Sequence, residues 1–193
     1  EVYAGVVAAE DDLFSAAEAT LTEDGPHALS LRKIAVRAGT TTQAVYTKFG
    51  GKAGLADALY RQGYEVLSDE LDRTDLPDDP IERIVALSAA YRAVALRRPH
   101  HYSLMTGRPI ADYVPPPASL SAARQTMQPL VDAVTSAIEV GTLEGQPEQV
   151  AIRLWAAGHG HISLELNGYI KTDAAEFEAL CRRLVDGHRP PTA

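Results

Sequence analysis

The polar side chains between residues 30 and 52 are of the types, and have the spacing, that contact with DNA requires. Glutamine can form two hydrogen bonds with the edge of adenine, threonine offers a hydroxyl and a methyl group, and hydroxyls and cations contact phosphates. We predict the following DNA contacts: Ser30, Arg32, Thr41, Thr42, Gln43, Tyr46, Lys48 and Lys52. Thr42 and Gln43 have the groups that read base edges. Lys48 and Lys52 supply cations for phosphates, and Tyr46 supplies a hydroxyl.

Positive charge is concentrated in this segment, although the whole chain has a formal net charge of -8. Residues 1–29 contain seven acids and no Lys or Arg, whereas residues 30–61 contain six bases and one acid. DNA responds to the local face within a Debye length of about 10 Å, not to the net charge of the molecule. The charge pattern alone is equally compatible with an ordinary solvated face, so the motif beneath it has to decide.

Two short helices joined by a glycine-containing turn would position these side chains. Ser30 is expected to cap a helix over 31–38, in which apolar residues recur on one face, and Gly39 to end it. Thr41 is expected to cap a second short helix over 42–49. This pattern predicts a helix-turn-helix unit, whose second helix lies in the major groove and presents its N-terminal residues to base edges.

The stretch LSLRKIAVRAGTTTQAVYTKFGGKAGL, residues 29–55, resembles the TetR family of transcriptional regulators. The family pattern has an Ile-Ala pair, an Ala-Gly pair and a Tyr-x-x-Phe-x-x-Lys run followed by Leu. The matching residues are Ile34, Ala35, Ala38, Gly39, Tyr46, Phe49, Lys52 and Leu55. One departure is Gly54, where the family usually carries an acidic helix former. Glycine there costs about 1 kcal/mol of helix propensity, so a softer start of the next helix is expected.

The resemblance implies a DNA-binding regulator, with repression favoured over activation, that a small-molecule effector releases from a palindromic operator. By position, Tyr46 and Lys52 would hold phosphates, and Thr41, Thr42 and Gln43 would lie at base edges. The alternative role of Tyr46 is packing, and that of Thr41 is capping only. An alternative function is a ligand carrier or sensor whose head no longer reads sequence, and a less favoured one is an enzyme built on the helical body.

The rest of the chain also carries helical periodicity, punctuated by proline and glycine. A first helix is expected to end near residue 24, and later helices over 52–73, 81–98, 100–106, up to 140 with a bend at Pro129, 148–167 and 174–186. We therefore predict an all-α protein of about nine helices. A three-helix helix-turn-helix DNA-binding domain is expected at 8–54, and a helical ligand-binding and dimerisation domain at 55–188.

The last two expected helices, 148–167 and 174–186, carry more apolar surface than one face can hold. A helix with two apolar faces must be covered on two sides. We expect a homodimer in which these helices of both subunits form a four-helix bundle. The alternative is that one subunit covers both faces itself. A dimer would place two heads on one axis, which suits a near-palindromic double-stranded DNA operator.

The stretch LWAAGHGHISLELNG, residues 154–168, resembles a C-terminal ligand-binding domain found in part of the same family, with a Trp…His-Gly signature. The resemblance implies an effector-binding body but names no effector. We predict the following pocket-lining residues: Tyr91, Tyr102, Met105, Met127, Trp155 and His159. Ordinary core packing is the alternative role for each. Because the region has no dense charge cluster, an apolar or mixed effector is favoured.

The sequence contains no comparable pattern for metal binding or catalysis. The pairs His100-His101 and His159-x-His161 lack the i, i+4 spacing of a two-histidine metal site, so no metal or other cofactor is expected. No nucleophile elbow, phosphate-binding loop or dinucleotide fingerprint occurs, so no catalytic residue is assigned. The single cysteine, Cys181, and the lack of an apolar run of about 20 residues are typical of a cytoplasmic protein without a membrane span.

Overall fold

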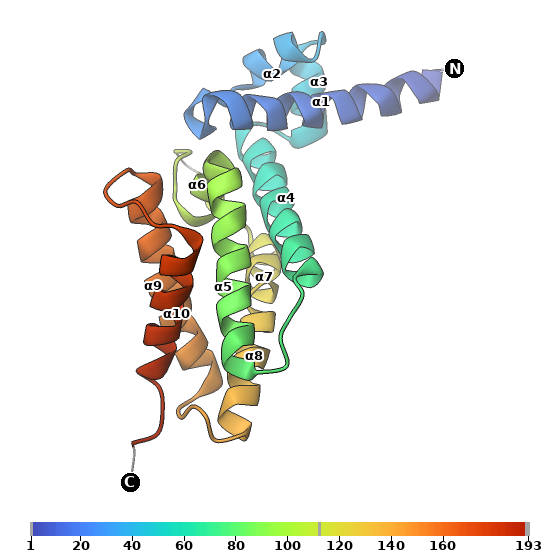
Figure 1. Cartoon of the computed structure of the whole chain (residues 1–193). Coiled ribbons are helices and arrows are strands. Elements are labelled where there is room, and N and C mark those ends of the chain that lie inside the picture. The colour runs from blue at the N-terminus through green and yellow to red at the C-terminus, as the bar shows by residue number, and fades with distance from the viewer. Residues whose placement is uncertain (1, 112, 192–193) are drawn as a thin grey trace. The chain divides into compact units, whose positions relative to one another are not determined.

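The computed structural model describes residues 2–111 and 113–191, with side chains from residue 12 onward, and its regular elements are all helical (Figure 1). The helices are α1 (Val2–Asp24), η1 (Pro26–Ala28), α2 (Leu31–Arg37), α3 (Thr42–Phe49), α4 (Lys52–Arg73), α5 (Pro80–Arg97), α6 (Pro99–Thr106), α7 (Pro117–Gln125), α8 (Gln128–Glu139), α9 (Pro147–Leu166) and α10 (Ala174–Asp186). No strand occurs in this part of the chain, which confirms the predicted all-α class.

The chain divides into two compact units. The first contains the chain up to Glu65 together with Arg98–Ala122, and the second contains Val66–Arg97 together with the chain from Ala123 on. Helices α4 and α7 each contribute residues to both units. The proposed boundary between residues 54 and 55 remains a prediction.

The first unit is built around α1, α2, α3 and the first half of α4. Its most deeply buried side chains are aliphatic and come from all four helices: Leu21, Ile34, Val45, Leu55 and Leu59. Helix α2 packs against both α1 and α3, and α6 packs against α1 and η1 (Figure 1). Burial of these aliphatic side chains, at about 1.5–3 kcal/mol each, fixes the orientation of α3 relative to α2.

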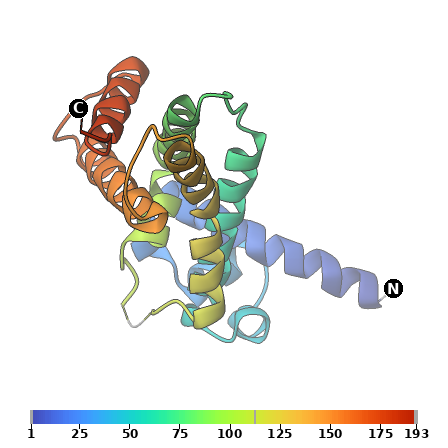
Figure 2. The same ribbon diagram turned by 90° about the horizontal axis from the view of Figure 1, so that it is seen from below.

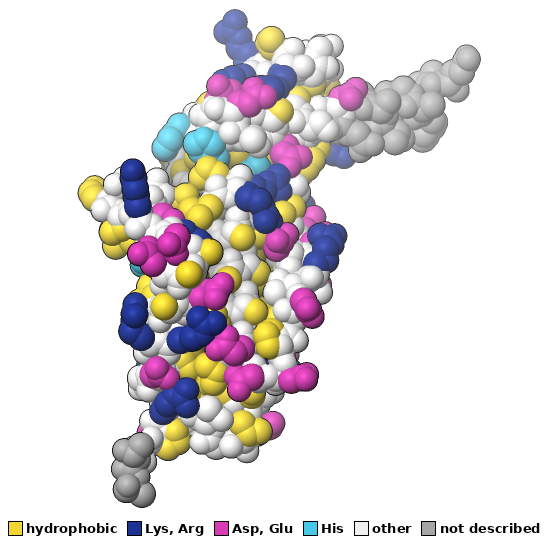
Figure 3. Space-filling view, in the orientation of Figure 1, with side chains coloured by type: hydrophobic (Ala, Val, Ile, Leu, Met, Phe, Trp, Pro, Cys, Tyr) yellow, Lys and Arg dark blue, Asp and Glu magenta, His cyan; other side chains and the backbone are white. Residues whose placement is uncertain are grey.

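The second unit surrounds α5, which packs against α8, α9 and α10. Helices α9 and α10 lie side by side in both views of the chain (Figures 1 and 2). The fully buried side chains that join these helices are Ile84, Val134, Ile162, Phe177 and Val185. Basic and acidic side chains are interspersed over the face formed by α5 and α10 (Figure 3). Each helix therefore buries an apolar stripe and leaves charged residues in water.

An ion pair inside the second unit joins α5 to α9 and to the loop before α10. The Arg92 guanidinium donates to both carboxylate oxygens of Glu165, over 2.6 and 2.8 Å, and to the Thr172 carbonyl over 2.6 Å. It also lies 5.2 Å from the centre of the Phe177 ring. The hydrogen bonds with Glu165 raise the pKa of Arg92. Because both side chains are nearly buried, removing either one would leave a charge without its partner.

One element differs from the prediction. The helix expected to bend at Pro129 and continue to residue 140 is two helices, because α7 ends at Gln125 and α8 begins at Gln128. Proline lacks an amide hydrogen, and its ring clashes with the carbonyl four residues earlier, so Pro129 is accommodated in the first turn of α8. The structure accordingly has ten α-helices and one 3-10 helix among its described residues, where about nine helices were predicted.

None of the helices in the described part of the chain combines the length and the apolar character that a membrane crossing requires.

Candidate nucleic-acid interface

The helix-turn-helix forms at the predicted residues because each helix start is capped by a side chain. The Ser30 hydroxyl accepts a hydrogen bond from the Lys33 amide over 3.2 Å, and the Thr41 hydroxyl accepts one from the Ala44 amide over 3.2 Å. Between the helices Gly39 has a φ of 63°, a conformation that favours glycine. These local interactions start α3 directly after the turn and therefore place its first turn at the surface.

The first turn of α3 presents neutral polar side chains to solvent. Thr41, Thr42 and Gln43 are all exposed, and so is Thr47 one turn after Gln43. Tyr46 is 54% exposed although its side chain is a large aromatic group. The structure thus gathers the predicted base-reading residues and Tyr46 on one short helix. Since a buried tyrosine could not reach a phosphate, this exposure favours contact over packing as the role of Tyr46.

The cations around the helix-turn-helix fall into two groups. The Lys33 ammonium lies 3.0 Å from the Asp24 carboxylate, and Arg37 donates a hydrogen bond to Glu23, so the acidic end of α1 neutralises two bases of α2. The hydrogen bond from Arg37 lowers the pKa of Glu23. Arg32 is exposed in the first turn of α2, and no carboxylate of the described residues forms an ion pair with it.

Lys52 is also exposed, at the start of α4, and no carboxylate of the described residues forms an ion pair with it. It follows α3 directly, where the resemblance places a phosphate contact. Two of the predicted DNA-contacting cations therefore flank α3 in the sequence, Arg32 before it and Lys52 after it. The positive charge available for DNA is smaller than the sequence count of residues 30–61 suggests.

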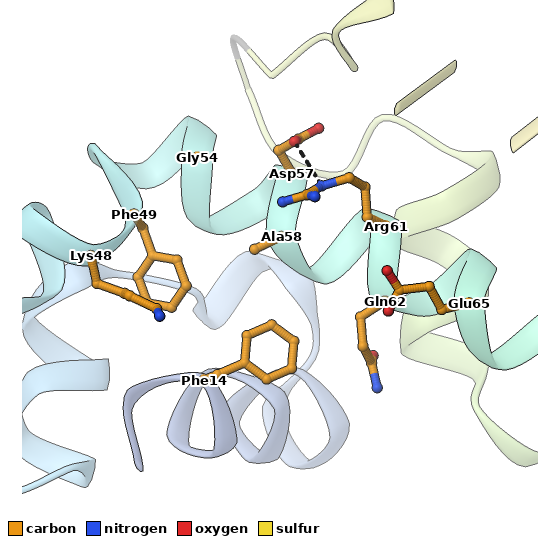
Figure 4. Close-up of a pocket in the computed structure, with 9 residues that line it drawn as sticks. All are labelled: Phe14, Lys48, Phe49, Gly54, Asp57, Ala58, Arg61, Gln62 and Glu65. Carbon is orange, nitrogen blue, oxygen red and sulfur yellow. Dashed lines mark ion pairs between the residues drawn. The ribbon is translucent and has the colours of Figure 1, made fainter. Parts of the chain in front are cut away.

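Lys48 occupies a different place from the other predicted contacts. It is exposed in the last turn of α3, where its side chain extends past the Phe49 ring in the view of Figure 4. It lines a pocket of about 490 Å³ within the first unit. The other lining residues come from α1, the end of α3 and α4: Phe14, Phe49, Gly54, Asp57, Ala58, Arg61, Gln62 and Glu65. Contact of Lys48 with DNA remains a prediction.

Gly54 has a steric role that sequence reasoning missed. A Cβ atom at this position would lie 1.7 Å from the Phe49 carbonyl oxygen, far inside contact distance. Glycine therefore lets the start of α4 approach the end of α3. The expectation of a softer start of α4 considered only helix propensity, whereas the structure shows that residue 54 sets how closely α4 follows the recognition helix.

Two polar clusters of the first unit were also not predicted. In one, the Asp57 carboxylate accepts hydrogen bonds from the Tyr113 hydroxyl at 3.0 Å and the Ser119 hydroxyl at 2.7 Å, which ties α4 to the segment after α6. Burial and the neighbouring Asp57 raise the pKa of Tyr113. The partners are 56 and 62 residues apart in sequence, so no local pattern could have shown this cluster.

The second cluster centres on Glu18 of α1. Its carboxylate accepts hydrogen bonds from Arg98 at the start of α6 and from the Gln62 amide of α4 at 3.2 Å. His101 lies beside them, with its Nε2 atom 3.3 Å from the Arg98 guanidinium. Burial and the Arg98 charge lower the pKa of His101 to about 4, so this histidine is neutral near pH 7. Three helices of the first unit thus share one polar contact.

The predicted effector-binding residues are distributed over both compact units. Tyr102 and Met105 are buried in the first unit, where the Tyr64 hydroxyl donates to the Met105 carbonyl over 3.3 Å. Met127 belongs to the second unit, where it is half-buried immediately before α8. None of the predicted effector-binding residues lines the pocket of Figure 4.

The remaining three predicted effector-binding residues form one aromatic group in the second unit. The Trp155 indole donates to the Tyr91 hydroxyl over 3.3 Å, and its ring stacks on His159 with 5.5 Å between centroids. Burial lowers the pKa of His159. Trp155 is 37% exposed, so the group lies at the surface of this unit as well as against its neighbours. Whether these residues line an effector pocket remains a prediction.

A capped helix, a glycine turn and a second capped helix with exposed polar residues define a DNA-binding protein of the helix-turn-helix class. Comparison with known families agrees with this class over most of the chain. Residues 13–59 match the family model described as bacterial regulatory proteins, tetR family. Residues 84–188 match the model described as tetracyclin repressor-like, C-terminal domain. The chain belongs to the TetR family and is a DNA-binding transcriptional regulator.

Individual relatives support the same assignment. The chain is 27% identical over 200 residues to the HTH-type transcriptional regulator Rv1816 of Mycobacterium tuberculosis, with 86% of each chain covered. A solved structure of a protein of unknown function from Rhodococcus sp. RHA1 is 28% identical, has a TM-score of 0.82, and aligns over 94% of this chain and 96% of that one.

A second solved structure supports the fold alone. A tetR-family regulatory protein from Rhodococcus RHA1 is 18% identical, with a TM-score of 0.71, over 92% of this chain and 96% of that one. At this identity the helical architecture is shared, while individual contact residues are not transferable.

Proposed function

We propose that this regulator is a repressor that binds a near-palindromic operator as a homodimer and leaves it when a small-molecule effector binds the helical body. Residues 8–54 form the DNA-binding segment of the proposal, and residues 55–188 form the effector-binding and dimerisation segment. The observation that carries it is the capped first turn of α3, which exposes Thr42 and Gln43 beside Tyr46. Side chains placed in this way can enter a major groove.

Pairing of two subunits through α9 and α10 is supported by uncovered apolar surface on α9. Ile152 is 55% exposed and Leu164 is 48% exposed, both on α9, and Trp155 lies between them in sequence. Ala156 and Gly160 on the same helix are small enough to let another helix approach closely. Covering these groups with a second copy would remove them from water and place two heads on one axis.

Effector control requires that the effector bind the released form better than the operator-bound form. A preference of a few kcal/mol shifts such an equilibrium strongly, whereas equal affinity for both forms shifts nothing. The proposed contacts are Tyr91, Trp155 and His159, together with the three other predicted lining residues: Tyr102, Met105 and Met127. The protein would act on DNA in the cytoplasm.

Transcription in vitro from the region upstream of the protein's own gene tests the proposal. Wild-type protein is expected to lower the amount of transcript, and a Gln43→Ala/Tyr46→Phe variant is expected to leave it unchanged. A template in which the upstream region is scrambled controls for non-specific binding. An increase in transcript would contradict repression. Equal inhibition of both templates by both proteins would instead indicate a head that no longer reads sequence.

A further inference from the structure

We propose that α3 selects A·T base pairs in each operator half-site, with Gln43 reading adenine and the methyl groups of Thr42 and Thr47 reading thymine. The inference rests on the proposed sequence-specific operator binding and deepens it. It concerns only the base pairs that face α3. Contacts made by Arg32 of α2 and Lys52 of α4 lie outside it.

The first turn of α3, the part of a recognition helix that presents its residues to base edges, contains no charged side chain. Thr42, Gln43 and Thr47 are exposed, and all three are neutral. The Thr41 hydroxyl accepts the hydrogen bond from the Ala44 amide that caps the helix and keeps its own proton to donate. The inference concerns the residues of α3 that follow this cap. Gln43 and Thr47 are one helical turn apart and share a face, so they can reach neighbouring base pairs.

Guanine and cytosine call for side chains that this surface lacks. Guanine is most often read by arginine or lysine bonded to its O6 and N7 atoms, and cytosine by a carboxylate that accepts from its amino group. Lys48, the charged residue of α3, is exposed in the last turn of the helix, away from the first turn that presents its residues to base edges. The nearby bases of α2, Lys33 and Arg37, are paired with Asp24 and Glu23.

Adenine and thymine match the groups that are present. The Gln43 amide can donate to adenine N7 while its oxygen accepts from the adenine amino group, which gives two hydrogen bonds to one base. A threonine methyl group can pack against the C5-methyl group of thymine, which cytosine lacks. The absence of a carboxylate on α3 and of a cation in its first turn, together with these two matches, favours A·T pairs over G·C pairs.

Selection from a random duplex library, made with the full-length wild-type protein and with Gln43→Ala in parallel, identifies the positions that α3 reads. The expected result is an A·T pair in each half-site whose preference Gln43→Ala relaxes. Gln125→Ala, which removes an exposed glutamine at the end of α7, serves as the matched control and is expected to select the wild-type sequence.

Modified bases then test which base atoms α3 contacts. Replacing the identified adenine with 7-deazaadenine removes the N7 acceptor and is expected to weaken wild-type binding about 10-fold, with little effect on Gln43→Ala. Replacing thymine with uracil removes the methyl group and is expected to weaken wild-type binding a few-fold. Thr42→Ser/Thr47→Ser should be insensitive to that replacement, whereas Thr22→Ser, an exposed threonine of α1, should behave as wild type.

The outcomes separate the inference from the function on which it rests. Selective binding in which the positions altered by Gln43→Ala are G·C pairs, or in which neither modified base matters, would overturn A·T selection and leave the operator proposal standing. Selection that recovers no preferred sequence would overturn the operator proposal, and A·T selection with it.

Discussion

Arg92 and Arg182 each form an ion pair with a glutamate that is distant in sequence, but the two pairs differ in their exposure to solvent. Arg92 and Glu165 expose only 11% and 12% of their side chains, whereas Arg182 and its partner Glu82 each expose 42%. Water and salt screen an exposed pair, so its net contribution to stability is small. A nearly buried pair is different, because the loss of one partner leaves the other charge desolvated.

Replacement of Arg92 by Met is therefore expected to lower the free energy of unfolding by about 3 kcal/mol, near the lower end of the range for a buried pair. Arg182→Met is the matched control and should cost less than about 1 kcal/mol. Urea unfolding at pH 7 measures both values. Equal effects of the two replacements would show that the Arg92 interaction contributes no more than a surface pair.

His101 should make the stability of the protein depend on pH. Its pKa is lowered to about 4 in the folded chain by burial and by Arg98, although Glu18 opposes the shift. Since the unfolded chain has an ordinary histidine pKa of about 6.5, it takes up a proton first as the pH falls. The stability contributed by neutral His101 is thus complete above about pH 6.5 and decreases as the pH falls towards 4.

The expected loss from this group is about 2 kcal/mol between pH 7.5 and pH 5, from the two pKa values and the linkage relation. Urea unfolding at several pH values measures it, and the NMR titration of the His101 ring measures the pKa directly. His27→Gln, which changes an exposed histidine, should leave the slope unaltered. A ring that titrates near pH 6.5 would refute this explanation.

Local residues of the interface could be predicted from sequence, whereas contacts between distant residues could not. The caps Ser30 and Thr41 act within three residues of themselves, so their spacing in the sequence already specifies the start of α2 and of α3. Pairs such as Arg92 with Glu165 are 73 residues apart, and only the packing of their helices brings them together. The exposure of the predicted DNA contacts also depends on that packing.

The packing of α4 against the end of α3 depends on a glycine, Gly54, which has no side chain. Helix propensity predicted a penalty for Gly54, and Pro129 predicted a bend. The structure gives each residue a stronger effect: Gly54 permits a close approach of two helices, and Pro129 separates α7 from α8. Propensity describes one helix in isolation, so it could not show the carbonyl of Phe49 beside Gly54.

Replacement of Gly54 by Ala is expected to lower stability by about 1–3 kcal/mol, because the added Cβ would overlap the Phe49 carbonyl and force α3 and α4 apart. The affinity of the Gly54→Ala variant for operator DNA should fall as well, since α3 would be displaced. Gly158→Ala is the control within a helix, where an added Cβ meets no atom within 4 Å. That variant should gain up to about 1 kcal/mol. Thermal unfolding of both variants measures these changes in stability, and a stabilised Gly54→Ala would contradict the steric role of Gly54.

At the scale of the whole molecule, the uncovered apolar side chains of α9 predict self-association. Wild-type protein is expected to sediment as a dimer at micromolar concentration, and Ile152→Asp/Leu164→Asp as a monomer with greatly weakened operator binding. Val140→Asp replaces an exposed apolar residue outside α9 and α10 and should remain a dimer. A wild-type monomer under these conditions would refute pairing through this surface.

Binding of the full-length protein to fragmented genomic DNA of its source, followed by sequencing of the retained fragments, tests the central claim most directly. Wild type and Gln43→Ala/Tyr46→Phe would be compared at two salt concentrations, because phosphate contacts weaken with salt while base contacts set the choice of sequence. The account predicts that wild type retains a few fragments sharing a near-palindrome and that the variant loses this selection at both concentrations. Retention of the same unselected fragments by both proteins would contradict operator recognition through α3.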